Sequence, residues 1–182
     1  CVSTKPGFKD VNYEEEFTRL NFFLDNYVGA FRLSIDTMNK DIAKYALDNN
    51  FEILNDVSGF KDPGMIELAV EKSSKIILVH THPDASHIQE KMEFKDVVQE
   101  VKAQLEIKIN YLISKGIKES QISIDPGLGF GKTMRDSEIL FKNLDVFCFG
   151  FPLVVGYSKK KFTEILNMTN YQLYTHLRCC IG

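Results

Sequence analysis

The sequence predicts an α/β protein built around a parallel sheet, on the basis of three observations. Helix-like and strand-like segments alternate along all 182 residues, no low-complexity linker divides them, and a polar residue follows each apolar strand. Such alternation predicts parallel strands joined by right-handed helical crossovers in one domain over residues 1–182. Both an open doubly wound sheet and a closed barrel satisfy this pattern, and a complete barrel needs about 250 residues.

Five segments have the apolar spacing of amphipathic helices, and three of them begin at a recognisable cap. The first covers residues 13–27 and the longest runs from about Phe94 to Lys115. Helices are also predicted after Asn39, after Asp62-Pro63 and after Thr133. A sixth helical segment is expected over residues 159–181.

Short apolar runs between these helices predict the strands. They are residues 31–35, 52–54, 76–79, 122–124 and 153–155, with the tail of a sixth strand at 1–4. The uninterrupted apolar run 76–79 is typical of a parallel strand buried on both faces.

Composition excludes several classes of protein. Charged residues make up 26% of the chain and the net charge is −3, which gives no reason to expect a nucleic-acid partner. No apolar run approaches the roughly 20 residues that span a bilayer. The four cysteines form neither a zinc pattern nor a disulfide framework, so we expect a cytoplasmic protein.

Polar residues stand at the carboxyl end of every predicted strand, where α/β folds place their ligand sites. These residues are Thr4, Asp36, Asn55, His80, Asp125 and Ser158. Two carboxylates and an amide suit a flat heterocycle that carries an amino group beside ring nitrogens. The alternative is that the two aspartates only cap loops. Lys160 offers a cation at the same edge, and Thr4 and Ser158 suit a second substrate or an anion.

The most distinctive string is the glycine-rich segment 125–132, Asp-Pro-Gly-Leu-Gly-Phe-Gly-Lys. Its glycines allow close approach of backbone to a ligand, but its spacing fits neither a Walker loop nor a dinucleotide fingerprint. Phe130 is placed either to flank an aromatic substrate or to pack over the rim.

Two histidines at alternate positions, His80 and His82, raise the alternative of a metal hydrolase. Pro83 follows His82 at once, and the remaining histidines are His87 and His176. A hydrolase site would need further histidines at later strand ends, and the sequence has none there.

Five motifs together resemble those of the dihydropteroate synthases. They are Ser-Thr-Lys-Pro-Gly at 3–7, Ser-Ile-Asp-Thr at 34–37, Asn-Asp-Val-Ser-Gly at 55–59, the glycine-rich string, and Gly-Tyr-Ser-Lys-Lys at 156–160. The resemblance implies a TIM-type (β/α)8 barrel, with about six of its eight units in this chain. It also implies Mg²⁺ as cofactor, a homodimer, membership of the enzyme class that sulfonamides target, and a synthesis of dihydropteroate from a dihydropterin pyrophosphate and 4-aminobenzoate.

The resemblance also implies a role for each matching residue. The pterin contacts would be Asp36, Asn55, Val79, Asp125, Phe130, Gly156 and Lys160, of which Asp36, Asp125 and Lys160 would matter most for catalysis. The 4-aminobenzoate contacts would be Thr4, Pro6, Phe130 and Ser158, and the pyrophosphate contacts Thr4, Lys5 and Lys159.

The sequence departs from the family pattern at several places. Lys5 and Lys159 stand where arginine is usual, and lysine lacks the planar two-point grip on phosphate. Val79 stands where methionine is usual. The asparagine that serves the metal in the family would precede Cys1, so we expect a fragment truncated at both ends and inactive in isolation, with no metal ligand in this segment.

Two other functions remain open on the sequence. One is a methyltransferase-type pterin barrel that binds methyltetrahydrofolate, which would have no use for the Ser-Lys-Lys segment at 158–160. The other is a pterin-binding protein without catalytic activity.

Overall fold

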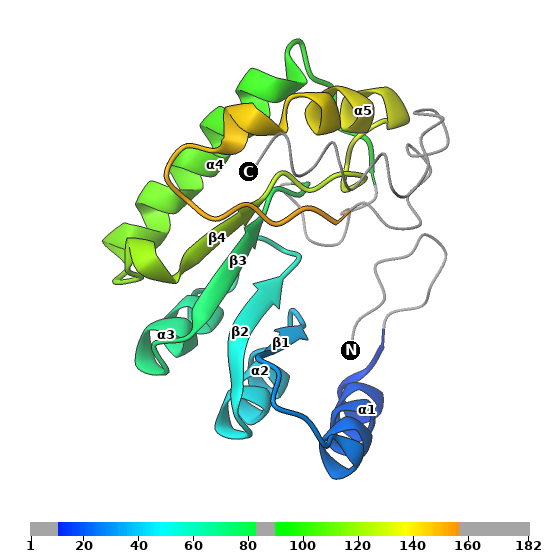
Figure 1. Ribbon diagram of the computed structural model, residues 1–182, viewed down its shortest axis with the longest axis vertical. Coiled ribbons are helices and arrows are strands. Elements are labelled where there is room, and N and C mark those ends of the chain that lie inside the picture. Colours follow the sequence, from blue (N-terminus) through cyan, green and yellow to red (C-terminus); the bar gives the residue numbers. More distant parts are fainter. Residues whose placement is uncertain (1–10, 83–89, 157–182) are drawn as a thin grey trace.

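The computed structural model describes residues 11–82 and 90–156 of the chain. Figure 1 shows strands β1 to β4 side by side, with helices packed along them. The strands are β1 (Leu33–Asp36), β2 (Phe51–Asp56), β3 (Lys75–Val79) and β4 (Ile122–Asp125). The helices are α1 (Tyr13–Asn26), α2 (Lys40–Asp48), α3 (Pro63–Glu71), α4 (Val97–Ser114) and α5 (Met134–Lys142), with 3-10 turns at Glu119–Gln121 and Leu144–Phe147.

The predicted caps begin the predicted helices. The Asn39 side chain accepts from the first turn of α2, and the Asp62 side chain accepts from Gly64 at the start of α3. Thr133 and Asp136 form the expected capping box of α5. The start of α4 was predicted three residues too early, because Asp96 accepts hydrogen bonds from the amides of Val98 and Gln99 and so caps the helix there.

The sheet is wholly parallel and its strand order follows the sequence, β1-β2-β3-β4. A doubly wound sheet reverses its strand order at a switch point, and the four described strands show no such reversal. This order is the one expected for the wall of a barrel.

A fifth segment continues the same order beyond β4, although it is shorter than predicted. Leu153 forms a single parallel bridge with Ile124, and Val154 donates to the Ile124 carbonyl oxygen at 2.8 Å. Pro152, which has no N–H, precedes the bridge and cannot donate to a longer ladder. The predicted strand at 1–4 and the helix at 159–181 lie outside the described residues.

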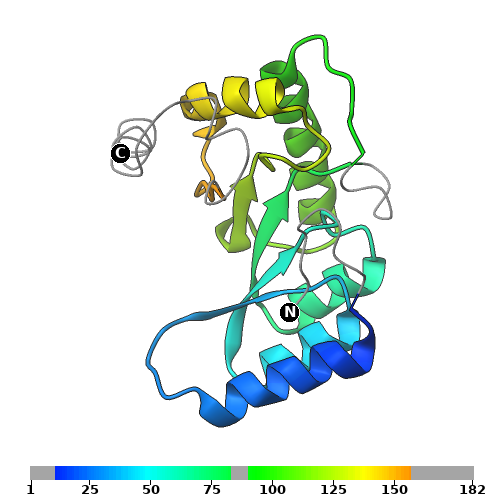
Figure 2. The same cartoon turned by 90° about the vertical axis from the view of Figure 1, so that its right-hand side faces the viewer.

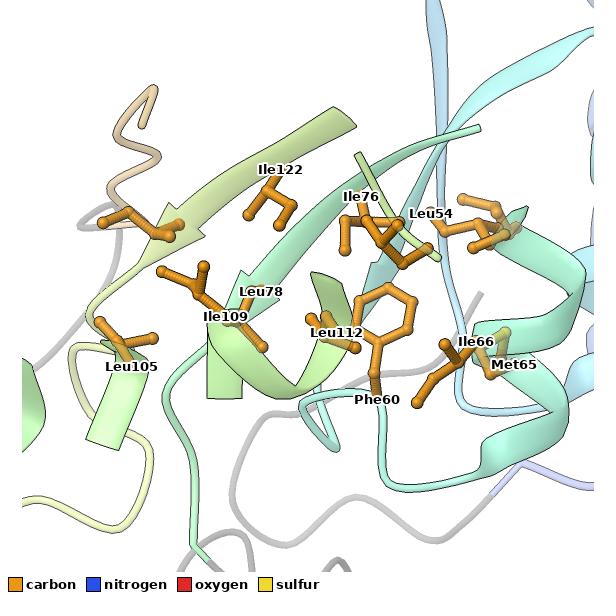
Figure 3. Packing of buried hydrophobic residues seen from close by; sticks show 14 of the residues in the cluster. Leu54, Phe60, Met65, Ile66, Ile76, Leu78, Leu105, Ile109, Leu112 and Ile122 are labelled. Carbon is orange, nitrogen blue, oxygen red and sulfur yellow. The ribbon is translucent and has the colours of Figure 1, made fainter. Parts of the chain in front are cut away.

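The hydrophobic core lies between the sheet and its helices. Ile35, Leu54, Ile76, Leu78 and Ile124 point to this side and are each at most 3% exposed. Figure 3 shows the core around Phe60, with Met65 and Ile66 of α3 on one side and Leu105, Ile109 and Leu112 of α4 on the other. Figure 2, which turns the view by 90°, shows α1 and α2 packed together at the β1 end of the sheet.

The opposite face of the sheet is more polar and less covered. Successive side chains of a strand alternate between faces, and residues paired in a parallel ladder share a face. Ser34, Asp36, Asn55 and Ser123 therefore lie on the face away from the core. In a barrel this face becomes the interior, so the fold itself gathers these side chains.

Candidate functional site

The site is built at the carboxyl ends of β1, β2 and β4. Asp36 pairs in register with Asn55, and Asp125 pairs with Val79. Asn55 pairs with Ile77, which comes two residues before Val79. Asp125 therefore lies two residues nearer the carboxyl ends of the strands than Asp36 and Asn55 do. The structure thus brings four of the predicted pterin contacts onto one face, at two adjacent levels.

Asp36 is in an environment that disfavours its charge. Burial raises the pKa of its carboxyl group to about 6, and the nearby carboxylates of Asp56 and Glu16 act in the same direction. Glu16 comes from α1 and is 2% exposed, and Asp56 is 1% exposed. The sequence analysis missed both of these neighbours, although Asp56 directly follows Asn55.

Asn55 presents an unused acceptor to the same face. Its side-chain Oδ1 is buried and has no hydrogen-bond partner among residues 11–82 and 90–156. A buried polar atom that lacks a partner costs about 1–3 kcal/mol, and such atoms mark places where a ligand is expected to bond. The backbone of Asn55 is ordinary, since its carbonyl oxygen accepts from the Thr37 amide at 3.1 Å.

Asp125 is buried and oriented by the glycine-rich segment that follows it. Its Oδ1 accepts from the Gly127 amide at 2.7 Å, and its carbonyl oxygen accepts from the His80 amide at 2.8 Å. Gly127, Gly129 and Gly131 all have positive φ, between 62° and 81°. At Gly127 a Cβ atom would lie 1.8 Å from the His80 carbonyl oxygen, so glycine is required there for space as well as for conformation.

Lys132 forms hydrogen bonds with the same segment, and the sequence analysis did not predict it as a site residue. It is 7% exposed, and its ammonium group contacts His80 Nδ1 at 2.9 Å and the carbonyl oxygens of Gly127 and Phe130, each at 3.0 Å. The signal in the sequence was a lysine at the end of a glycine-rich string. Phe130 itself is half-buried at the rim.

His80 does not act as a metal ligand in this arrangement. Besides the Lys132 contact, its Nε2 lies 3.0 Å from Oε1 of Gln104 on α4, so both ring nitrogens are engaged. Within the described ranges no three His, Cys, Asp or Glu side chains gather closely enough to hold a metal ion. The described residues therefore do not by themselves form the Mg²⁺ site that the resemblance implies.

The remaining predicted contacts divide into two groups. Gly156 is exposed just after the Leu153 bridge, and Val79 is 4% exposed at the end of β3. Thr4, Lys5, Pro6, Ser158, Lys159 and Lys160 lie outside the described residues. Their roles stay predictions.

The sequence matches the family model described as pterin binding enzyme over residues 1–179. The dihydropteroate synthase of Escherichia coli strain K12 is 29% identical over 184 residues, which covers 98% of this chain and 65% of that protein. The chain spans 55% to 65% of the length of that relative and of those from Haemophilus influenzae and Bacillus subtilis.

Two solved structures are similar in fold. The dihydropteroate synthase of Xanthomonas albilineans with 4-aminobenzoic acid has a TM-score of 0.83 at 29% identity, over 98% of this chain and 65% of that one. The Burkholderia cenocepacia enzyme complexed with 7,8-dihydropteroate has a TM-score of 0.81 at 26% identity, over 99% and 69%. This likeness confirms the predicted α/β barrel fold.

Proposed function

The chain belongs to the pterin binding enzyme family, and from this premise we propose that the whole protein is a dihydropteroate synthase. It would condense 6-hydroxymethyl-7,8-dihydropterin pyrophosphate with 4-aminobenzoate to give 7,8-dihydropteroate and pyrophosphate. The relatives named above carry this activity in their names, and one of the solved structures holds 4-aminobenzoic acid and the other 7,8-dihydropteroate.

The observation that carries the proposal is the set of Asp36, Asn55 and Asp125 on one face of the sheet. A pterin ring presents an amino group and ring N–H donors on one edge, beside a carbonyl acceptor. Carboxylates accept from such donors, and an amide both donates and accepts. The buried Oδ1 of Asn55, which has no hydrogen-bond partner in the described part of the chain, supports a ligand at this place.

The reaction needs no nucleophile from the protein. The amine nitrogen of 4-aminobenzoate forms a bond to the methylene carbon of the pterin, and the carbon–oxygen bond to pyrophosphate breaks. The electron pair leaves with pyrophosphate, and the amine releases a proton. The residues of the site hold the ring, so that its delocalised electrons stabilise the developing methylene cation.

The other contacts follow from the family resemblance. We propose that Val79, Phe130, Gly156 and Lys160 border the pterin, and that Thr4, Pro6, Phe130 and Ser158 receive 4-aminobenzoate. Thr4, Lys5 and Lys159 would bind pyrophosphate. Mg²⁺ would supply charge neutralisation for the leaving pyrophosphate when bound.

The localisation, oligomeric state and inhibitor class that we propose rest on the same resemblance. We propose a cytoplasmic homodimer of the class that sulfonamides inhibit. Among the described residues, no helix is long and apolar enough to cross a membrane.

Binding of the pterin substrate to an Asp125 variant tests the proposal. Asp125→Ala removes a buried acceptor and leaves the donors of the ring unpaired, which costs about 1.5–3 kcal/mol or a 10- to 150-fold loss of affinity. Isothermal titration calorimetry on the full-length protein measures this loss. Asp145→Ala, an exposed aspartate in the turn after α5, is the control and should bind normally. Unchanged pterin affinity in a folded Asp125→Ala protein contradicts the assignment.

A further inference from the structure

Lys132 joins two elements that sequence places far apart. Its ammonium group has four acceptors within 3.2 Å: Nδ1 and the carbonyl oxygen of His80 at the end of β3, and the carbonyl oxygens of Gly127 and Phe130 in the glycine-rich segment. An ammonium group has three N–H donors, and this cluster offers an acceptor to each of them. Of these acceptors, only the Phe130 carbonyl belongs to a residue that we predict to contact a substrate.

The path from Lys132 to the substrate face runs through Gly127. The Gly127 carbonyl accepts from Lys132, the Gly127 amide donates to Asp125 Oδ1 at 2.7 Å, and its Cα packs against the His80 carbonyl oxygen. A glycine has the widest choice of backbone conformations, so it needs external contacts to stay in one. Lys132 supplies such a contact at the Gly127 carbonyl, in the same residue whose amide donates the hydrogen bond that orients Asp125.

His80 keeps a single tautomer because of the same lysine. Lys132 can only donate, so His80 Nδ1 must accept, and the ring proton sits on Nε2, where it donates to Gln104. Burial and the neighbouring Lys132 charge lower the pKa of His80 to about 3. The imidazole therefore stays neutral, and the acceptor for Lys132 is preserved across the physiological range of pH.

We propose that Lys132 is a positioning residue, which fixes the carboxylate of Asp125 for the pterin ring through Gly127 and the neutral His80. This inference rests on the proposed function, because it gives Asp125 a pterin to receive. It goes beyond that function by assigning pterin affinity to a side chain that does not touch the substrate. A purely structural lysine would change the fraction of folded protein and leave the affinity of the folded fraction unchanged.

The test is to measure pterin affinity in a protein that lacks only the ammonium group. Lys132→Met in the full-length protein should weaken binding of dihydropterin pyrophosphate by about tenfold or more in calorimetry, corresponding to one lost charged hydrogen bond. In steady-state kinetics the KM for the pterin substrate should rise by a larger factor than the KM for 4-aminobenzoate, because Asp125 is a proposed contact of the pterin only.

Lys108→Met is the matched control. Lys108 is half-buried and, like Lys132, donates to a loop carbonyl, that of Phe60 at 3.0 Å, but it makes no contact that leads to Asp125. Its replacement should lower stability without changing pterin affinity by more than about twofold. Equal losses in both variants overturn the proposal, because they would show a general effect of loosened loops.

Nuclear magnetic resonance of the unaltered protein keeps the proposal testable if Lys132→Met does not fold. With ¹⁵N-labelled histidine, His80 should show an unprotonated Nδ1 and a protonated Nε2 from pH 5 to 8. A proton on Nδ1 overturns the proposal, because Lys132 then has no acceptor there.

If the unaltered protein binds no dihydropterin pyrophosphate, the proposed function fails. If it binds and a folded Lys132→Met protein binds equally well, only the present inference fails.

Discussion

Asp36 shows how strongly the chemistry of one residue depends on its neighbours. Its pKa rises from 3.8 to about 6, first because it is buried and then because Asp56 and Glu16 lie near. A carboxyl group that holds its proton more tightly in the folded chain makes folding less favourable once it is ionised. This loss of folding stability occurs at the position where a carboxylate acceptor for the pterin is expected.

The pH dependence of pterin binding tests this assignment. The free energy of unfolding should fall as pH rises from about 4 to about 6, because the unfolded chain releases the proton first. Pterin affinity should instead rise with pH over this range. Below about pH 6, where Asp36 is protonated, the affinity should fall by roughly tenfold for each unit by which the pH is lowered.

The variant Asp36→Asn separates the two effects. It should stabilise the protein at pH 7.5 by about 1–2 kcal/mol in urea unfolding, since part of the shift is screened by solvent, and it should remove the inflection in binding near pH 6. Asp41→Asn on the exposed side of α2 is the control and should change neither. An Asp36→Asn protein that is less stable at pH 7.5 contradicts the interpretation.

Gly127 is the second residue at which local geometry decides the outcome. Its φ is +69°, and a Cβ would meet the His80 carbonyl oxygen at 1.8 Å, so Gly127→Ala should cost about 2–4 kcal/mol of stability and reduce pterin affinity. Gly150→Ala is the control, since Gly150 also has a positive φ, +102°, but nothing lies within 4 Å of its Cβ position. Urea denaturation of both variants measures the difference, and equal losses would mean that the close contact has no energetic effect.

At the scale of elements, α4 is the helix that supports the site from the core side. Its buried residues belong to the same core cluster as those of β3 and β4, while Gln104 on the same helix forms a hydrogen bond with the His80 ring. Leu112 is 0% exposed and Ile107 is 70% exposed, so the helix separates a buried from an exposed face.

Substitutions on the two faces of α4 should therefore differ. Leu112→Ala should cost about 2–5 kcal/mol, because it removes transfer free energy and leaves a cavity in the core. Ile107→Ala should cost less than about 0.5 kcal/mol, because its side chain is already in solvent. Thermal unfolding followed by circular dichroism compares the two, and similar losses would show that the buried face of α4 was wrongly assigned.

At the scale of the whole molecule, the sequential order of the strands produces the site. Each strand is neighbour to the next one along the chain, so their carboxyl ends form one continuous edge. Four of the predicted pterin contacts, one on each of the strands β1 to β4, meet there, although 89 positions separate Asp36 from Asp125. A barrel wall achieves this with ordinary strands and short loops.

The two lysines of the segment 156–160 give a prediction that belongs to the complete active site. Successive side chains that leave a strand point in different directions, and the resemblance places Lys160 at the pterin and Lys159 near pyrophosphate. In the full-length protein Lys160→Ala should lose most of kcat/KM. Lys159→Arg should be tolerated or improve the rate, because the guanidinium group binds phosphate with two hydrogen bonds. Steady-state kinetics measure both variants. The reverse result would mean that we have assigned the residues of this motif one position out of register.

The sequence by itself determined the elements and the polar residues at their ends. Local signals are sufficient for this: caps at Asn39, Asp62 and Thr133 depend on hydrogen bonds within three residues, and apolar spacing marks the buried faces. The family motifs then predicted Asp36 and Asp125 as site residues without any coordinates.

The tertiary structure alone decided which distant groups act on these residues. The pKa of Asp36 is raised first by its burial and then by the charges of Asp56 and of Glu16 on α1. The role proposed for Lys132 depends on its contact at 2.9 Å with His80, which lies 52 positions away in the sequence. Such contacts arise from the crossing of separate elements, and no local pattern in the chain encodes their distances. Burial and charge interactions fall off over a few ångströms, so the chemistry of the site was settled only when the sheet and its helices were assembled.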